Sequence, residues 1–171
     1  IKTRSPFGWE QYNYRNFSTH FNHFNKSTMT KAEKKQLRYD TAYMRMAMEW
    51  AKLSHCKRKQ VGSLIVKDRM IISDGYNGTP TGFENACEDE EHYTKWYVLH
   101  AEANAIMKVA SSTQSCAGAT LYITLSPCKE CSKLIHQAGI IRVVYATAYK
   151  DSSGIEFLKR AGVEVVALPL D

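Results

Sequence analysis

Apolar residues recur along most of the chain at the spacings that distinguish helices from strands. From Asp40 to Leu53 they fall at helical intervals on one face, which predicts an amphipathic helix. Two runs rich in β-branched residues, 61–66 and 70–76, predict a hairpin. The remaining pattern predicts three helices alternating with three strands: helices at 101–110, 128–138 and 155–160, strands at 119–124, 142–146 and 163–166. This order is typical of an α/β sandwich with a mixed sheet whose later strands are parallel.

Two segments depart from this pattern. Residues 1–28 contain seven aromatic residues and four Asn but no sustained period, so residues 1–30 are predicted to be an N-terminal extension of a domain at 31–171. The extension is either a remnant of upstream sequence or an arm that orders on a partner. Residues 77–95 are rich in Gly, Pro and Thr and then acidic, and a loop this long in a compact domain is usually functional.

The positive charge of the chain is unevenly distributed. The net charge is +6, but residues 1–40 hold eight Lys and Arg against three Asp and Glu, and residues 41–171 hold fifteen against fourteen. A nearly neutral domain argues against a basic nucleic-acid-binding face, whereas a small anionic substrate needs only one or two cations.

The composition of the chain also indicates where in the cell the protein is located. No run of eighteen apolar residues and no apolar signal segment are seen, so neither a membrane span nor export is expected. Five cysteines are an odd number, which favours metal ligands or reduced thiols over a disulfide framework. The expected location is the cytoplasm.

Two short motifs carry the candidate chemistry. His100 and Glu102 stand at the start of one predicted helix, and Cys128 and Cys131 at the start of another. Cysteines three residues apart in a helix share a face, so both sulfurs can reach one metal ion. One His and two Cys are three protein ligands, the number typical of catalytic zinc, which keeps a fourth position for water. Glu102 is then expected to move the proton of that water.

Each motif alone has other interpretations. Cys128-x-x-Cys131 also suits a redox dithiol or half of a structural zinc site, and a lone His100 is more often structural. A zinc-stabilised binding module without activity would need a fourth protein ligand, for which Cys116 is a candidate.

The combination His100-Ala101-Glu102 with Pro127-Cys128-Lys129-Glu130-Cys131 resembles the signature of zinc nucleobase deaminases, and the resemblance to the cytidine deaminase-like superfamily runs from about Tyr39 onward. The stretch 75–82, Gly-Tyr-Asn-Gly-Thr-Pro-Thr-Gly, is similar to deoxycytidylate (dCMP) deaminases. The family implies a three-layer α/β/α sandwich with a mainly five-stranded mixed sheet. The implied activity is zinc-dependent hydrolysis of dCMP to dUMP and ammonia, which feeds thymidylate synthesis.

The resemblance implies further properties. Relatives are commonly regulated by dCTP, with Mg²⁺ as a possible companion, and by dTTP, and many are homo-oligomers, including hexamers. Deamination of adenosine in tRNA, or of another nucleobase, is the alternative activity.

Substrate or effector contacts are expected at Gly75, Tyr76, Asn77, Gly78 and Tyr149. An ordinary Asn-Gly turn and core packing of the tyrosine are the alternatives. Candidates for phosphate binding are Lys129, Lys150 and the basic run 57–59, any of which can instead be solvated surface charges.

Overall fold

A computed structural model describes residues 29–170. Four helices and five strands follow one another along this part of the chain: α1 (Lys31–Ala51), β1 (Gly62–Lys67), β2 (Met70–Tyr76), α2 (Ala101–Ala110), β3 (Thr120–Leu125), α3 (Lys129–Gln137), β4 (Arg142–Thr147), α4 (Ser153–Arg160) and β5 (Glu164–Ala167). No helix within these residues is both long enough and apolar enough to cross a membrane.

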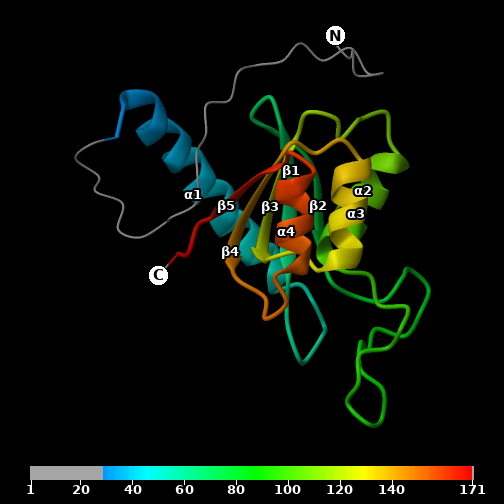
Figure 1. Ribbon diagram of the computed structural model, residues 1–171. Helices are drawn as coiled ribbons and strands as arrows, with labels where there is room; N and C mark the ends of the chain where they lie inside the picture. The colour runs from blue at the N-terminus through cyan, green and yellow to red at the C-terminus, as the bar shows by residue number, and fades with distance from the viewer. Residues whose placement is uncertain (1–28, 171) are drawn as a thin grey trace.

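The five strands form one mixed sheet in the order β2-β1-β3-β4-β5. The β1–β2 and β1–β3 pairs are antiparallel, whereas β3, β4 and β5 run parallel. The predicted hairpin and the predicted parallel half of the sheet are therefore both confirmed. In Figure 1 the β2–α2 loop (green) projects away from the sheet.

Of the four described helices, α1 alone covers one face of the sheet. Met44 and Ala47 of α1 are fully buried against Leu64 of β1 and Tyr122 of β3. Thr30 and Glu33 form a reciprocal capping box that satisfies backbone N–H groups at the start of the helix. This cap places the helix start at Lys31, nine residues before the predicted start at Asp40.

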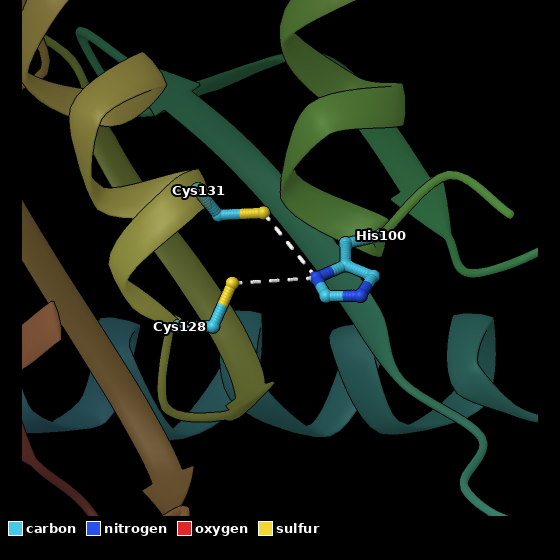
Figure 2. Close-up of side chains that lie close together, drawn as sticks. All are labelled: His100, Cys128 and Cys131. Carbon is cyan, nitrogen blue, oxygen red and sulfur yellow. Dashed lines mark hydrogen bonds between the residues drawn. The ribbon is translucent and has the colours of Figure 1, made fainter. Parts of the chain in front are cut away.

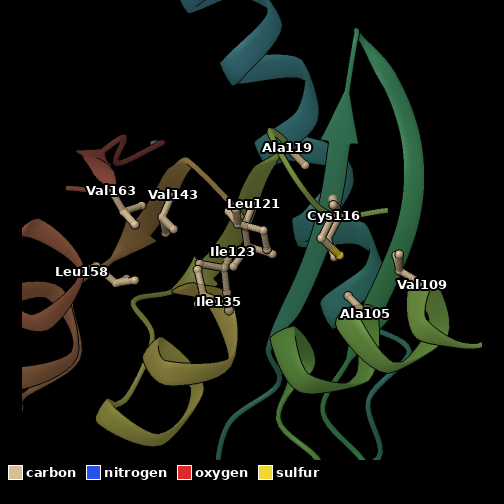
Figure 3. Close-up of a cluster of buried hydrophobic side chains, with 12 residues drawn as sticks. Ala105, Val109, Cys116, Ala119, Leu121, Ile123, Ile135, Val143, Leu158 and Val163 are labelled. Carbon is tan, nitrogen blue, oxygen red and sulfur yellow. The ribbon is translucent and has the colours of Figure 1, made fainter. Parts of the chain in front are cut away.

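The other three helices cover the opposite face. Residues of β1 and β3 that alternate with those facing α1, such as Ile65, Leu121 and Ile123, pack there against α2, α3 and α4 (Figure 3). This two-residue alternation buries both sides of the central strands, because each side of the sheet is covered by helices. The predicted three-layer α/β/α sandwich is confirmed. Of the predicted extension at 1–30, residues 1–28 lie outside the described part of the chain.

The expectation of reduced thiols is wrong for two of the five cysteines. Cys56 and Cys87 form a disulfide, although 31 residues separate them in sequence. The segment after α1 and the β2–α2 loop lie side by side, where Glu88 accepts the backbone N–H groups of Lys57 and Arg58. This proximity is tertiary, so the cysteine count and spacing did not reveal it.

A buried ion pair ties α1 to the sheet. The Arg142 guanidinium donates to both carboxylate oxygens of Asp40 at 2.9 Å, and the Tyr122 hydroxyl donates to Oδ1 at 2.6 Å. Burial alone would raise the pKa of the Asp40 carboxyl, but the contacts with Arg142, Tyr122 and Gln36 outweigh it and hold the pKa below its usual value. Asp40 is therefore ionised in the folded protein at neutral pH.

We expect Asp40→Asn to lower the free energy of unfolding at pH 7 by about 3 kcal/mol. Among residues 29–170, the substitution leaves Arg142 with the half-exposed Glu164 as its one charged partner. A depressed pKa contributes stability that is complete above about pH 5 and is lost as the pH falls through the unfolded-state pKa toward the folded-state pKa. Urea unfolding from pH 7 down to pH 3 should therefore show the two proteins converging. Glu49→Gln, which breaks an exposed pair with Lys52, is the control and should change little. If the two proteins differed in free energy of unfolding by the same amount at every pH, the ionised state assigned to Asp40 would be contradicted.

Candidate metal centre and adjoining pocket

Three of the predicted site residues meet at one point. His100 Nδ1 lies 3.6 Å from Cys128 Sγ and 3.4 Å from Cys131 Sγ, and the imidazole points between the two sulfurs (Figure 2). Cys131 is buried, Cys128 is half-buried and His100 is exposed. Among residues 29–170, the group of His, Cys and acidic side chains with metal-binding geometry consists of these three.

The ends of two helices bring these side chains together. His100 is the N-cap residue of α2, Cys128 is the N-cap residue of α3, and Cys131 lies in the first turn of α3. Neither N-cap side chain makes a capping hydrogen bond, so the imidazole and the thiol remain available to a ligand. The positive ends of both helices also favour thiolates.

The spacing of the three donor atoms fits zinc. With Zn–S near 2.3 Å and Zn–N near 2.0 Å, tetrahedral coordination separates a nitrogen from a neighbouring sulfur by about 3.5 Å. The two observed Nδ1–Sγ distances, 3.4 and 3.6 Å, bracket that value. One imidazole and two thiols are also the donor types that zinc prefers.

The two thiols differ in acidity. A hydrogen bond from the Cys131 thiol lowers the pKa of Cys128 to about 3, and the contact with His100 acts in the same direction. The same hydrogen bond raises the pKa of Cys131, and the contact with Cys128 raises that of His100. Of the two thiols Cys128 is the more acidic, and zinc binding would displace the proton that Cys131 holds.

Glu102 is buried in the first turn of α2, two residues beyond His100. Its burial raises the pKa of the carboxyl above the usual value of 4.5. A carboxyl that holds its proton more tightly is suited to both accepting and donating one.

His100, Glu102 and Cys128 line one cavity of about 380 Å³, a size typical of small-molecule sites. Other parts of its wall come from the segment after α1, the β2–α2 loop and the end of β3. Three cationic side chains, Arg58, Lys59 and Lys150, also belong to the lining. The cavity thus combines a buried acid and a metal-binding cluster with a cationic rim.

The structure divides the predicted substrate contacts into two groups. Asn77 and Tyr149 line the cavity. Gly75, Tyr76 and Gly78 do not, and instead support α2. The Tyr76 carbonyl accepts a hydrogen bond from Asn104, and Gly78 pairs with Leu99 immediately before His100. A Cβ atom at Gly75 would lie 2.2 Å from the Ala101 carbonyl oxygen, so only glycine lets α2 pack this closely.

Of the phosphate candidates, Lys150 reaches the cavity together with Arg58 and Lys59 of the basic run, whereas Lys57 and Lys129 are not part of its lining. The sequence did not single out several other lining residues, among them Glu88, Thr94, Val98 and Ser126. Ser126 directly precedes the Pro127-x₃-Cys131 motif, and this position is the one local feature that connects it with the site. The positions of the loop residues depend on how the β2–α2 loop folds back.

Cys116, the candidate fourth ligand, lies elsewhere. It is buried in the apolar core with Ala105, Val109 and Ala119 (Figure 3). The binding-module alternative therefore loses the ligand it required.

Comparison with known proteins gives consistent matches. The family of the cytidine and deoxycytidylate deaminase zinc-binding region matches residues 37–147, which include all four residues of the two motifs. The deoxycytidylate deaminase of Enterobacteria phage T4 is 34% identical over 159 residues, covering 68% of this chain and 82% of the phage protein. That of Saccharomyces cerevisiae is 36% identical over 74% of this chain, which spans only 44% of the yeast protein.

Among solved structures, the dCMP deaminase of cyanophage S-TIM5 in complex with dCMP and dUMP superimposes with a TM-score of 0.74. The two chains are 43% identical, and the match covers 82% of this chain and 99% of the cyanophage chain. The similarity therefore extends over nearly the whole fold of that protein as well as its motifs.

The Asn77 side chain is itself a structural bridge at the cavity wall, since its Oδ1 accepts the Val61 N–H at 2.8 Å and its Nδ2 donates to the Lys59 carbonyl at 2.8 Å. We expect Asn77→Ala to reduce the free energy of unfolding by about 1–3 kcal/mol, because both backbone groups lose their partner. Chemical denaturation measures the change. Asn85→Ala, at an exposed position in the same loop, is the control and should stay within about 0.5 kcal/mol of the unmodified protein. Equal stability of both variants would show that the bridge contributes nothing.

Proposed function

The chain belongs to the cytidine and deoxycytidylate deaminase family, and from this premise we propose that it hydrolyses dCMP to dUMP and ammonia. The observation that supports the reaction is the single cavity that joins the His100, Cys128 and Cys131 cluster to the buried carboxyl of Glu102. The choice of dCMP is supported by the 43% identity to the cyanophage enzyme bound to dCMP and dUMP.

We propose that His100, Cys128 and Cys131 hold the zinc ion of this family. Zinc held by three protein ligands acts as a Lewis acid and makes water nucleophilic near neutral pH. Glu102, buried beside the cluster, would accept a proton as water attacks C4 of the cytosine. It would pass that proton to N3, and would then carry the remaining proton of the new C4 hydroxyl to the departing amine. Ammonia leaves, and the bond from C4 to its exocyclic nitrogen is replaced by a C4=O bond.

The charges of the cavity indicate how the nucleotide lies. The base must reach Glu102, so the phosphate would lie toward the lining cations Arg58, Lys59 and Lys150. Arg58 also donates to Thr94 Oγ1 at 3.3 Å, which links it to the β2–α2 loop. Asn77 and Tyr149 would form the walls between the two ends, with the Asn77 amide already occupied by backbone partners.

Family resemblance further supports regulation by dCTP, with Mg²⁺ as its companion, and by dTTP. It also supports a homo-oligomer, for which a hexamer is the expected form, and a cytoplasmic location. The near neutrality of residues 41–171 favours a free nucleotide over a nucleic acid as substrate.

A direct test is spectrophotometric assay of the purified full chain with dCMP, deoxycytidine, cytidine and an adenosine-bearing tRNA stem-loop, each alone. Turnover is expected for dCMP. Turnover of the stem-loop alone would favour the RNA alternative, and none with zinc-loaded protein would reject the enzymatic function. Repeating the dCMP assay with dCTP and Mg²⁺, and with dTTP, tests regulation.

We expect Glu102→Gln to keep its zinc yet lose at least about 100-fold in kcat, because the amide cannot carry the proton. His100→Ala should instead lose zinc. Metal analysis of the purified proteins together with dCMP turnover separates the two effects. Glu130→Gln, which changes an exposed carboxylate of the cysteine motif paired with Lys133, should retain both zinc and activity. Undiminished turnover by Glu102→Gln would remove Glu102 from the proposed mechanism.

Arg58→Ala and Lys150→Ala should each raise KM for dCMP by about 10-fold or more, because hydrogen bonds to a charged phosphate are worth about 1.5–3 kcal/mol. Any residual activity on deoxycytidine, which lacks the phosphate, should be unaffected. Lys159→Ala, an exposed cation on α4 outside the cavity lining, is the control. Parallel losses with both substrates would show that these side chains do not recognise the phosphate.

A further inference from the structure

The turn that carries Cys128, residues 126–128, is supported from behind by the β4–α4 connection. The backbone N–H of Ser126 donates to the Thr147 carbonyl at 2.8 Å, and the N–H of Tyr149 donates to the Ser126 hydroxyl at 2.8 Å. The connection therefore runs along the turn and leads into α4.

At the start of α4, backbone packs directly on backbone. A Cβ atom at Gly154 would lie 2.3 Å from the Pro127 carbonyl oxygen and 2.8 Å from the Cys128 carbonyl carbon. It would also lie 2.7 Å from Ser132 Oγ. Two of these three atoms are backbone, so a side chain at 154 could be accommodated only if the turn moved.

Ser132 holds the same turn from within α3. It is fully buried, and both its N–H and its hydroxyl donate to the Cys128 carbonyl oxygen, each at 2.9 Å. The N–H bond is the ordinary first bond of the helix, whereas the hydroxyl bond is specific to this side chain. Ser132 also lies against Gly154, so the two residues form one support.

We propose that Gly154 and Ser132 are positioning residues for the metal ligand Cys128, an inference that rests on the zinc site of the proposed function. The Cys128 side chain makes no capping bond to its own helix, so the direction of its sulfur follows from the backbone of the turn. A shift of that backbone moves Sγ relative to His100 Nδ1 and Cys131 Sγ. Outer residues that orient zinc ligands typically contribute 10–100-fold to metal affinity.

The test compares zinc affinity in Gly154→Ala, Ser132→Ala and the unmodified full chain. Gly62→Ala is the matched control: a Cβ there would lie 2.1 Å from the Ala47 carbonyl oxygen, an equally severe backbone contact, but beneath α1. Competition with a coloured chelator gives the Kd for zinc, and the thiolate-to-metal absorption of the Co²⁺-substituted protein reports the geometry around sulfur. Circular dichroism and thermal unfolding establish how much of each protein is folded.

Gly154→Ala is expected to bind zinc about 10–100-fold more weakly and Ser132→Ala about 10-fold more weakly, both with an altered Co²⁺ spectrum. Gly62→Ala should lower Tm while its folded fraction keeps the Kd and spectrum of the unmodified protein. If Gly154→Ala does not fold, Ser132→Ala decides, because it introduces no steric clash.

Unchanged zinc affinity and spectrum in folded Ser132→Ala and Gly154→Ala would overturn this inference alone. Equal weakening by Gly62→Ala would overturn it too, since the effect would then be general destabilisation. A failure of the unmodified chain to bind zinc through His100 would overturn the proposed metal site itself, and this inference with it.

Discussion

The close approach of the α2 and α3 N-termini is the constraint on which the site depends. His100 can contact both sulfurs only because these helix ends lie within one side-chain length of each other. Two glycines control the contact. Because Gly75 has no Cβ atom, α2 packs in backbone contact with β2. In the same way, Gly154 allows α4 to pack against the turn before α3. Residues far apart in sequence thus determine a distance of a few ångströms.

Charge within the cavity follows a gradient of burial. The acid Glu102 and the thiol of Cys131 lie in the interior, whereas the cations Lys59 and Lys150 are exposed. Burial raises the pKa of the carboxyl, so Glu102 is suited to holding and passing on a proton. A phosphate bound at the exposed rim would lose less of its hydration than it would in the interior, and the rim offers it cations. One small cavity therefore presents different environments to the two ends of a nucleotide.

The β2–α2 loop connects these two environments. It is covalently joined to the segment after α1 by the Cys56–Cys87 disulfide, and Glu88 caps two N–H groups of that segment. Asn77 adds a bridge from the start of the loop to Lys59 and Val61. The cavity wall is thus cross-linked by polar contacts and one disulfide.

The order of helices and strands, the mixed sheet and the four residues of the two motifs could all be predicted from the sequence. These features depend on local periodicity and on the spacing of ligands within a single turn. Both patterns can be recognised within short segments of the sequence. Helix α1 begins earlier than its apolar period predicts, because its first turn is charged and exposed and is stabilised by the Thr30–Glu33 capping box. The disulfide was missed because sequence separation carries no information on which loops lie together.

Tertiary structure alone decided the roles of the Gly75–Gly78 stretch. The family resemblance favoured substrate or effector contacts there, whereas the residues alone favoured an ordinary Asn-Gly turn. In the structure Gly75, Tyr76 and Gly78 pack on α2 and on the residue before His100, and Asn77 lines the cavity. Likewise, nothing local distinguished Gly154 or Ser132 from other small residues. The sequence determined which chemical groups are present and which share a helical turn. Their distances across the fold depend on how closely separate backbones can pack, and that became visible only in three dimensions.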